Sequence, residues 1–543
     1  MIRYFKRHAL SVISALLLGI LTQLLTPVSA VLEQRMVDLI VSGDMQAFLN
    51  LLWAAGAMVT GIAFCYFLSS TVEKQFAARF EESLRNDLFE GVMRRSASRF
   101  AEEDTAVYMS YITSSAGTLV QNLTQPVFYL ISYGVSALVV LGIMLRYSPL
   151  LAILSLACGG ISMVLPLRFH KRLGGLLADK VEKTAAMGVQ LKEALSGHEV
   201  IFSYGVFANL RRRFVMANTD VARTDQKLGI TISELENIGH FMDRMAWILT
   251  FWVAGTLAVR GDITVGTLVM FVSLFAYFSG SVTVYAQCLP LLLSNRENIQ
   301  LLLGIIDEDS KDFTGGEDVG LTDRIEIRGL SFGYQKEVPV LEKLDLTIHK
   351  NEKVALTGPS GCGKSTLIKL LTGSRADYTG SICYDGRELH DIAPEKLREL
   401  VTVIHQNTFI FNDTLRFNIC LGEEFPAEEL RRAVELSGVA RFLSNIPGGL
   451  EGDCGESGSR LSGGERQRIA LARALIRGVK VLILDEGVSA IDVATANEIE
   501  QELLDRKDLT LLTVTHRIRD GLTQQYDRIL VMRDGRVEGK VIE

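Results

Sequence analysis

The sequence has few of the features that mark secreted, metal-binding or nucleic-acid-binding proteins. Its seven cysteines include no CxxC pair and no zinc-ligand spacing; they are Cys65, Cys158, Cys288, Cys362, Cys383, Cys420 and Cys454. This pattern indicates reduced thiols and small core hydrophobes rather than a disulfide framework. The formal net charge of −7 and the lack of a basic stripe with interleaved aromatic residues argue against a nucleic-acid partner.

Charge is also scarce within long apolar runs of the first 295 residues. Six such runs occur, at approximately residues 9–31, 48–70, 123–145, 150–167, 245–259 and 265–293. Runs of this kind are typical of membrane-spanning helices, which tolerate internal Gly and Pro. The alternative for the shorter runs is a buried helix of a soluble domain, which six runs in succession disfavour. The sequence therefore predicts an all-α, six-span transmembrane domain over residues 1–295.

The first of these runs also has the features of a signal peptide, with a basic start and a small-residue end at Val28-Ser29-Ala30. The further spans favour a first transmembrane helix over a cleaved segment. We therefore expect residues 9–31 to stay in the protein and to cross the bilayer.

Basic residues are concentrated in two long connections between the runs. Six Lys or Arg residues lie in 74–99 and eleven lie in 168–227, whereas the other connections contain only Arg35, Arg146 and Arg260. The positive-inside rule then places both termini and these two connections in the cytosol, with the chain in the cell membrane. Both connections are long and periodic, so we expect helices that extend beyond the bilayer and turn back.

Some polar and aromatic residues of the runs are candidates for a substrate cavity. Asp243 and Arg244 lie at the cytosolic entry of the fifth run, where charge indicates either a functional site or an interfacial salt bridge. The aromatic candidates are Tyr129, Tyr133, Trp247, Trp252 and Tyr277, for which packing and interfacial anchoring are the alternatives.

A glycine-rich segment organises the remaining part of the chain, in which 296–323 is predicted as a linker and 324–543 as an α/β domain. The segment follows the apolar stretch 352–357 and precedes the helical pattern 367–371, and it consists of Gly358, Pro359, Ser360, Gly361, Cys362, Gly363, Lys364, Ser365 and Thr366. Strand, glycine-rich turn and helix N-terminus are the context of a phosphate-binding loop. Lys364 then supplies charge for the phosphates, and Ser365 supplies a hydroxyl for Mg²⁺.

Two carboxylates follow a second apolar stretch, Val481-Leu482-Ile483-Leu484. Ligand chemistry gathers at the carboxyl ends of parallel strands. Asp485 is therefore predicted to hold Mg²⁺, and Glu486 to polarise an attacking water as general base. An apolar strand ending in Asp-Glu is common by itself, and its occurrence downstream of a phosphate loop is what indicates an ATPase.

A second anion site is predicted where Ser462, Gly463, Gly464 and Glu465 precede a helical stretch. One fold cannot easily bring two phosphate-binding devices to one nucleotide, whereas two copies facing head to tail can sandwich ATP between them. Tyr334 is a candidate for stacking on adenine, and a core tyrosine is the alternative.

Together these motifs resemble those of the ATP-binding cassette (ABC) family, and the order of parts resembles an ABC exporter half-transporter. The resemblance implies that Gln406 contacts Mg²⁺ and the membrane domain, that Asp492 belongs to a loop crossing the dimer interface, and that His516 contacts the γ-phosphate. Gly455-Glu456-Ser457-Gly458 resembles an extra loop of exporters. Departures from the family pattern are His405, Gly487, Val488 and Ile491, none of which removes a catalytic group.

The resemblance implies a multidomain membrane protein, with a six-helix transmembrane domain followed by an α/β P-loop ATPase. We expect ATP-driven export of a small peptide, lipid or amphiphile by alternating access, with ATP and Mg²⁺ bound between two half-transporters. A homodimer is favoured because all catalytic motifs are intact, and a heterodimer is the alternative. An ATP-gated channel or a regulatory protein of the same architecture is the alternative function.

Overall fold

The computed structural model describes residues 1–307, 319–334, 338–406, 408–485, 493–516, 518 and 521–540. The chain forms two compact units: Met1–Arg94 with Glu102–Glu308, and Arg95–Ala101 with Asp309–Glu543. The short segment 95–101, which contains helix α4 (Ala97–Phe100), groups with the second unit although it lies between two helices of the first. It belongs to the first of the two basic connections found in the sequence.

The first unit is helical. Six of its helices have 30 residues or more: α2 (Ala9–Ser42), α3 (Met45–Arg94), α6 (Ala116–Tyr147), α7 (Pro149–Ser196), α9 (Phe207–Arg260) and α10 (Val265–Ser294). The shorter elements are α1 (Ile2–Arg7), α5 (Thr105–Ser110), the π-helical turn η1 (Tyr111–Ser115), α8 (His198–Tyr204) and α11 (Arg296–Asp307). The first part of the predicted linker is therefore helix α11, which packs against α3.

Four helices of the described part are long and apolar enough to cross a membrane: Ala9–Ser42, Met45–Arg94, Thr105–Tyr147 and Val265–Leu293. They contain four of the six predicted spans. The other two lie in α7, where Pro149–Cys158 is a shorter apolar stretch, and in α9, whose apolar stretch is short and flanked by charges at Asp243, Arg244 and Arg260. That these two helices also cross the bilayer stays a prediction.

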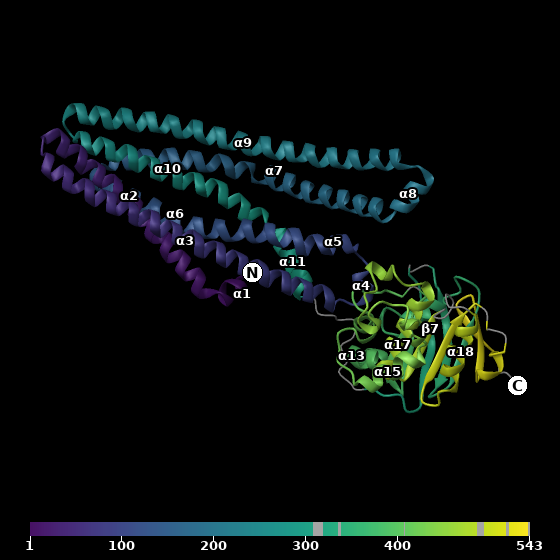
Figure 1. Ribbon diagram of the computed structural model, residues 1–543. Helices are drawn as coiled ribbons and strands as arrows, with labels where there is room; N and C mark the ends of the chain where they lie inside the picture. Colours follow the sequence, from purple (N-terminus) through teal and green to yellow (C-terminus); the bar gives the residue numbers. More distant parts are fainter. Residues whose placement is uncertain are drawn as a thin grey trace. The chain divides into compact units, whose positions relative to one another are not determined.

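Helices α7 and α9 run side by side and are joined through α8 (Figure 1). With 48 and 54 residues, they are about 70–80 Å long at 1.5 Å per residue, more than twice the hydrocarbon thickness of a bilayer. Polar contacts join them along the part rich in charge: Lys180 pairs with Asp225 at 2.7 Å, and Lys183 donates to Thr224 at 3.0 Å. The expected long helical extensions that turn back are thus present.

The start of α10 is fixed tightly to α2. Thr264 caps α10 by accepting from the Thr267 amide, and the Gly266 amide donates to Asp38 Oδ1 at 3.1 Å. A Cβ added at Gly266 would lie 2.3 Å from the Gln34 carbonyl oxygen, so only glycine permits this approach. One glycine thereby sets the spacing of two apolar helices.

We expect Gly266→Ala to destabilise the protein by about 1–3 kcal/mol, because the methyl group would push α10 away from the α2 backbone. Gly280→Ala in the same helix is the matched control, since a Cβ there has no atom within 4 Å and alanine favours the helix. Thermal unfolding of the purified protein in detergent measures both. Equal melting temperatures for the two variants would contradict the prediction.

The second unit contains two sheets, with strand orders β2-β1-β4-β5 and β10-β9-β3-β8-β7-β6. Its strands are β1 (Arg324–Phe332), β2 (Leu341–His349), β3 (Lys353–Thr357), β4 (Thr379–Tyr384), β5 (Arg387–Glu388), β6 (Val401–Ile404), β7 (Val481–Asp485), β8 (Thr510–Thr515), β9 (Arg528–Arg533) and β10 (Arg536–Lys540). The first sheet is antiparallel, and in the second β9, β3, β8, β7 and β6 are parallel. The predicted strands before the glycine-rich turn and before Asp485 are confirmed as β3 and β7.

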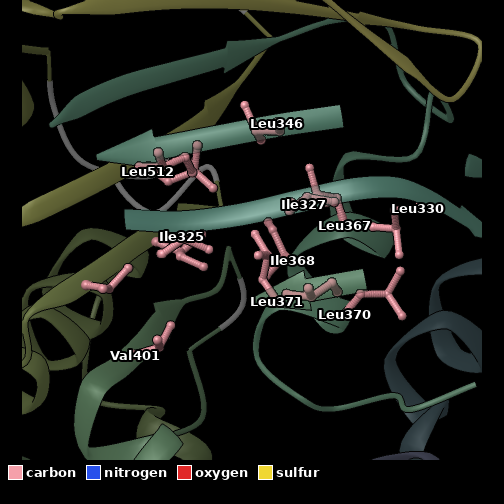
Figure 2. Close-up of a cluster of buried hydrophobic side chains, with 14 of the residues drawn as sticks. Ile325, Ile327, Leu330, Leu346, Leu367, Ile368, Leu370, Leu371, Val401 and Leu512 are labelled. Atoms are coloured by element: carbon pink, nitrogen blue, oxygen red, sulfur yellow. The ribbon is translucent and has the colours of Figure 1, made fainter. Parts of the chain in front are cut away.

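The helices of this unit surround separate hydrophobic cores. Among the described residues, its α-helices besides α4 are α12 (Lys364–Leu371), α13 (Pro394–Leu400), α14 (Leu415–Cys420), α15 (Ala427–Leu436), α16 (Ala440–Leu443), α17 (Gly463–Ile476) and α18 (Val493–Asp505). Leu367, Ile368 and Leu371 of α12 pack in one core with Ile325 and Ile327 of β1 (Figure 2). A different core joins α17 to α14 and α15. The apolar face of α12 thus anchors the turn that precedes it.

Candidate functional site

The carboxyl ends of four neighbouring parallel strands bring most of the predicted site residues together. In the strand order β3-β8-β7-β6, Thr357 lies opposite Thr515, Asp485 opposite Val514, and Ile404 opposite Leu484. The residues that follow these strands therefore gather at one sheet edge, which is where ligands bind in open α/β sheets. They are the turn beginning at Gly358, His516, the strand-terminal Asp485, and Gln406.

The turn between β3 and α12 passes very close to β9. A Cβ at Gly358 would lie 2.3 Å from the Met532 carbonyl oxygen, and one at Gly363 would lie 2.7 Å from Leu341 Cδ2. Gly363 also has φ +109°, a backbone conformation that favours glycine. Only glycine therefore permits the turn to lie this close to β9 and β2, and its role as a phosphate loop stays a prediction.

Lys364, the first residue of α12, is 7% exposed. Its ammonium donates to the carbonyl oxygens of Gly358 at 2.7 Å and Pro359 at 2.8 Å. The positive charge is thus held over the glycine-rich turn, beside the helix N-terminus. Ser365, the next residue, is exposed, so its hydroxyl is accessible to a ligand.

Two histidines lie at this sheet edge. His516 Nδ1 is 3.2 Å from the Gly358 carbonyl oxygen, which places the predicted γ-phosphate contact beside the glycine-rich turn. His405 Nδ1 is 3.8 Å from Asp485 Oδ2. The sequence had identified His405 only as a departure from the family pattern, and its contact with the predicted magnesium ligand is new. The contact follows from the pairing of β6 with β7, whose carboxyl ends lie side by side. A prediction of that strand order would have indicated it.

Gln406 is exposed, and its carbonyl oxygen accepts a hydrogen bond from Gln467 Nε2 of α17 at 3.3 Å. The backbone after β6 is therefore tied to the helix that carries the Ser462-Gly463-Gly464 motif. This bond involves the backbone of Gln406 and not its side chain. The predicted contact of Gln406 with magnesium therefore stays a prediction.

The Tyr334 ring is half-exposed and packs edge-on against Phe332, with ring centroids 5.1 Å apart. Its hydroxyl lies 3.3 Å from Thr366 Oγ1 in α12. Arg375 Cζ is 5.2 Å from the ring centroid, and Lys369 Nζ is 5.9 Å from it. The ring is therefore positioned beside the phosphate loop, which favours adenine stacking over a core role. The two nearby cations were missed by sequence reasoning.

The second predicted anion site begins helix α17. Ser462 and Glu465 form a reciprocal capping box, in which the Glu465 amide donates to Ser462 Oγ at 3.3 Å and the Ser462 amide donates to Glu465 Oε2 at 2.7 Å. Leu461, just before the motif, packs in the core shared with α14 and α15, whereas Cys362 of the glycine-rich turn packs in the core of α12. Residues of the two predicted phosphate-binding motifs thus pack in different cores.

Part of the predicted site lies outside the described residues. The predicted general base Glu486 and the interface residue Asp492 both lie there, together with Ser489, Ala490 and Ile491. The roles of these residues stay predictions. Gly487 and Val488, which depart from the family pattern, also lie outside the described residues.

The site fits a magnesium-bound nucleoside triphosphate by its donor set. The amides of the glycine-rich turn and the Lys364 ammonium match phosphate oxygens. The Ser365 hydroxyl and the Asp485 carboxylate are hard oxygen ligands of the type that Mg²⁺ prefers. When bound, the ion would neutralise charge on the β- and γ-phosphates.

A cavity of about 350 Å³ lies in the helical unit between α7, α9 and α10. Phe275, Phe278 and Ala286 contribute apolar walls. Two polar rows also line it: Glu236, His240 and Asp243 from α9, and Ser279, Thr283 and Gln287 from α10. Ser279 Oγ donates to Asp243, so this carboxylate is an element of the cavity wall.

Comparison with known proteins agrees with both units. A family model described as ABC transporter matches residues 341–489, and one described as ABC transporter transmembrane region matches residues 12–282. The chain belongs to the ABC transporter family. This ABC transporter has both a membrane region and an ATPase domain in one chain, as half-transporters do, and it hydrolyses ATP to drive export.

Named relatives of this ABC transporter cover most of its length. An ATP-dependent lipid A-core flippase of Syntrophus aciditrophicus is 28% identical over 88% of this chain and 79% of the relative. The flippase of the same name from Vibrio cholerae is 27% identical over 88% of this chain and 84% of its own. A fatty acid ABC transporter ATP-binding/permease protein of Mycobacterium bovis is 26% identical over 87% of this chain and 74% of its own.

Among solved structures, a bacterial Atm1-family ABC exporter with ATP bound matches with a TM-score of 0.90, covering 99% of this chain and 95% of its own. At 20% identity this likeness shows the fold, a helical transmembrane domain followed by an α/β nucleotide-binding domain. The ABC transporter is thus a membrane protein that binds nucleotide, and its family generally works as a dimer.

Proposed function

We propose that this ABC transporter exports a lipid-like amphiphile, and that the substrate binds in the cavity between α7, α9 and α10. The cavity carries the proposal, because its volume of about 350 Å³ falls within the roughly 300–1,000 Å³ of small-molecule sites. Its phenylalanine walls suit an apolar chain, and its two polar rows suit a polar head group. The names of relatives that act on lipid A-core or fatty acid support a lipidic substrate over a peptide.

Two chains would bind ATP head to tail. Each nucleotide would lie between the glycine-rich turn of one chain, with Tyr334 stacked on the adenine, and the Ser462-Gly463-Gly464 motif of the other. Cys362 in the glycine-rich turn and Leu461 beside the second motif pack in different cores, which favours this arrangement over a site within one chain. We infer a homodimer because the sequence contains every catalytic motif, and a heterodimer is the alternative.

In this arrangement Lys364 and the turn amides bind the phosphates, and His516 contacts the γ-phosphate. Ser365, Gln406 and Asp485 would hold Mg²⁺. Glu486 accepts a proton from the attacking water, whose oxygen forms a bond to the γ-phosphorus while the bond to the leaving ADP oxygen breaks. Six spans, with both termini and the ATPase domain in the cytosol of the cell, complete the proposed topology.

Export is tested with purified protein in proteoliposomes that contain fluorescent phospholipid and fatty acid analogues. We expect ATP-dependent movement of at least one analogue between leaflets. We also expect Ala286→Trp, which fills the cavity, to lower that movement at least 10-fold while ATP hydrolysis continues. Leu138→Trp is the matched control, because Leu138 is 72% exposed on α6 and away from the cavity.

Each other outcome has a distinct meaning. Equal transport by the two tryptophan variants would overturn the cavity assignment. Transport of peptides but not of lipid analogues would overturn the substrate class. An ion current that needs ATP binding but no ATP turnover would support the alternative of an ATP-gated channel.

A further inference from the structure

A second, much smaller cavity lies in the helical unit, between α2, α3 and α6, apart from the cavity proposed for the substrate. Its volume is about 40 Å³. That exceeds the roughly 10–15 Å³ that one water-sized guest needs and is far too small for a lipid or a peptide. Glu73 of α3 contributes the one charged side chain among the described residues that line it.

Glu73 is 7% exposed. Within the described part of the chain, its carboxylate has no hydrogen bond and no ion pair, although it lines the cavity; the charge of Lys74 acts on it, but less strongly than burial does. The adjacent Lys74 is exposed and does not line the cavity. A buried carboxylate that lacks a partner is costly in any protein interior, and more so in a membrane domain. Something must neutralise it.

Two of the hydroxyls that line this cavity, those of Thr22 and Ser69, donate their hydrogens to backbone carbonyl oxygens. Thr22 Oγ1 donates to the carbonyl oxygens of Leu18 and Gly19, both at 2.8 Å, and Ser69 Oγ donates to the Ala15 carbonyl oxygen at 3.2 Å. Because each hydroxyl has a single hydrogen, the lone pairs of these two oxygens remain for a guest. The cavity thus combines one negative charge with several acceptor oxygens.

Helices α2 and α6 also approach each other closely in the wall of this cavity. A Cβ at Gly19 would lie 2.8 Å from Ser132 Oγ, so glycine admits the Ser132 hydroxyl to this side of α2. Tyr129 and Tyr133, with ring centroids 5.8 Å apart, form part of the same wall. Tyrosine rings present a negative face to cations.

We propose that Glu73, with the hydroxyl oxygens of Thr22, Ser69 and Ser132, binds one small monovalent metal cation, Na⁺ or K⁺. Hard oxygen ligands suit such ions, and a single carboxylate balances a single charge. The bound ion would join α2, α3 and α6 and thereby stabilise the helical unit. This inference concerns a different cavity from the proposed substrate site and does not depend on it.

The test uses the purified full-length transporter in detergent, at fixed pH and ionic strength, with NaCl or KCl exchanged for choline chloride. We expect one of the two metal ions to raise the melting temperature by about 3 °C in a saturable manner, because a ligand of the native state stabilises it. Glu73→Gln should abolish the rise. Glu82→Gln is the matched control, since Glu82 is exposed on the same helix.

Binding of ²²Na⁺ to the wild-type protein, with unlabelled K⁺ as competitor, gives a second measurement that does not need the variant to fold. We expect about one ²²Na⁺ per chain. The concentration of unlabelled K⁺ that displaces it shows which of the two ions binds more tightly. A wild-type melting temperature that is the same in all three salts, with no ion bound, would overturn the proposal and leave protonation to neutralise Glu73. A rise that persists in Glu73→Gln would also overturn it.

Discussion

Replacing Lys364 with alanine is expected to abolish ATP binding at millimolar nucleotide and to reduce ATP hydrolysis to background. The Lys364 ammonium is buried and held over the glycine-rich turn by the carbonyl oxygens of Gly358 and Pro359. It is therefore positioned to meet phosphate oxygens at short range in a site of low dielectric, where an ion pair is strong. Nucleotide binding is measured by titration with a fluorescent ATP analogue, and hydrolysis by phosphate release.

The matched control for this variant is Lys350→Ala, because Lys350 is exposed and lies before β3, outside the nucleotide site. Its affinity and turnover should equal those of the wild type. ATP binding by Lys364→Ala with unchanged affinity would show that the glycine-rich turn is not the phosphate site.

Replacing Glu486 with glutamine is expected to lower ATP hydrolysis by about 10²–10⁴-fold, the usual contribution of a general base, while ATP still binds. Glutamine keeps the shape of the side chain and removes its ability to accept a proton. The two ATPase domains should then remain closed on their nucleotides, which cysteine cross-linking or retention of labelled ATP can detect.

Glu395→Gln serves as the control, since Glu395 is an exposed residue of α13 whose ion pair with Arg398 contributes little. Hydrolysis by Glu486→Gln at the wild-type rate would make the assigned base wrong. If the wild-type chain alone binds ATP without hydrolysing it, the homodimer is overturned, and a second, different half-transporter becomes the expected partner.

The family and the ATP chemistry could be predicted from short stretches of sequence. Strand, glycine-rich turn and helix are contiguous at residues 352–371, so their geometry depends on local backbone preferences and on the apolar faces of β3 and α12. The strand that ends at Asp485 is equally local. Such motifs can be identified without knowing how the rest of the chain folds.

Other expectations depended on more than local pattern and were only partly met. The segment after Asn295 contains polar residues and was predicted as linker, yet Leu302 and Ile305 are buried when α11 packs on α3. The apolar stretch of α9 is short because charges flank it, so length and composition alone do not establish it as a span. Packing partners, which the sequence does not name, decide both cases.

By itself, the sequence determined which family and ATP chemistry to expect of this chain, because the residues predicted to bind phosphate and magnesium occur in contiguous motifs with short-range geometry. Only the tertiary structure decided which distant residues meet. It placed His405 beside Asp485, Ser279 on Asp243 in the wall of the larger cavity, and Glu73 among hydroxyl oxygens from α2 and α6. The physical reason is that such contacts depend on how whole helices and strands pack, and no single stretch of sequence contains that information.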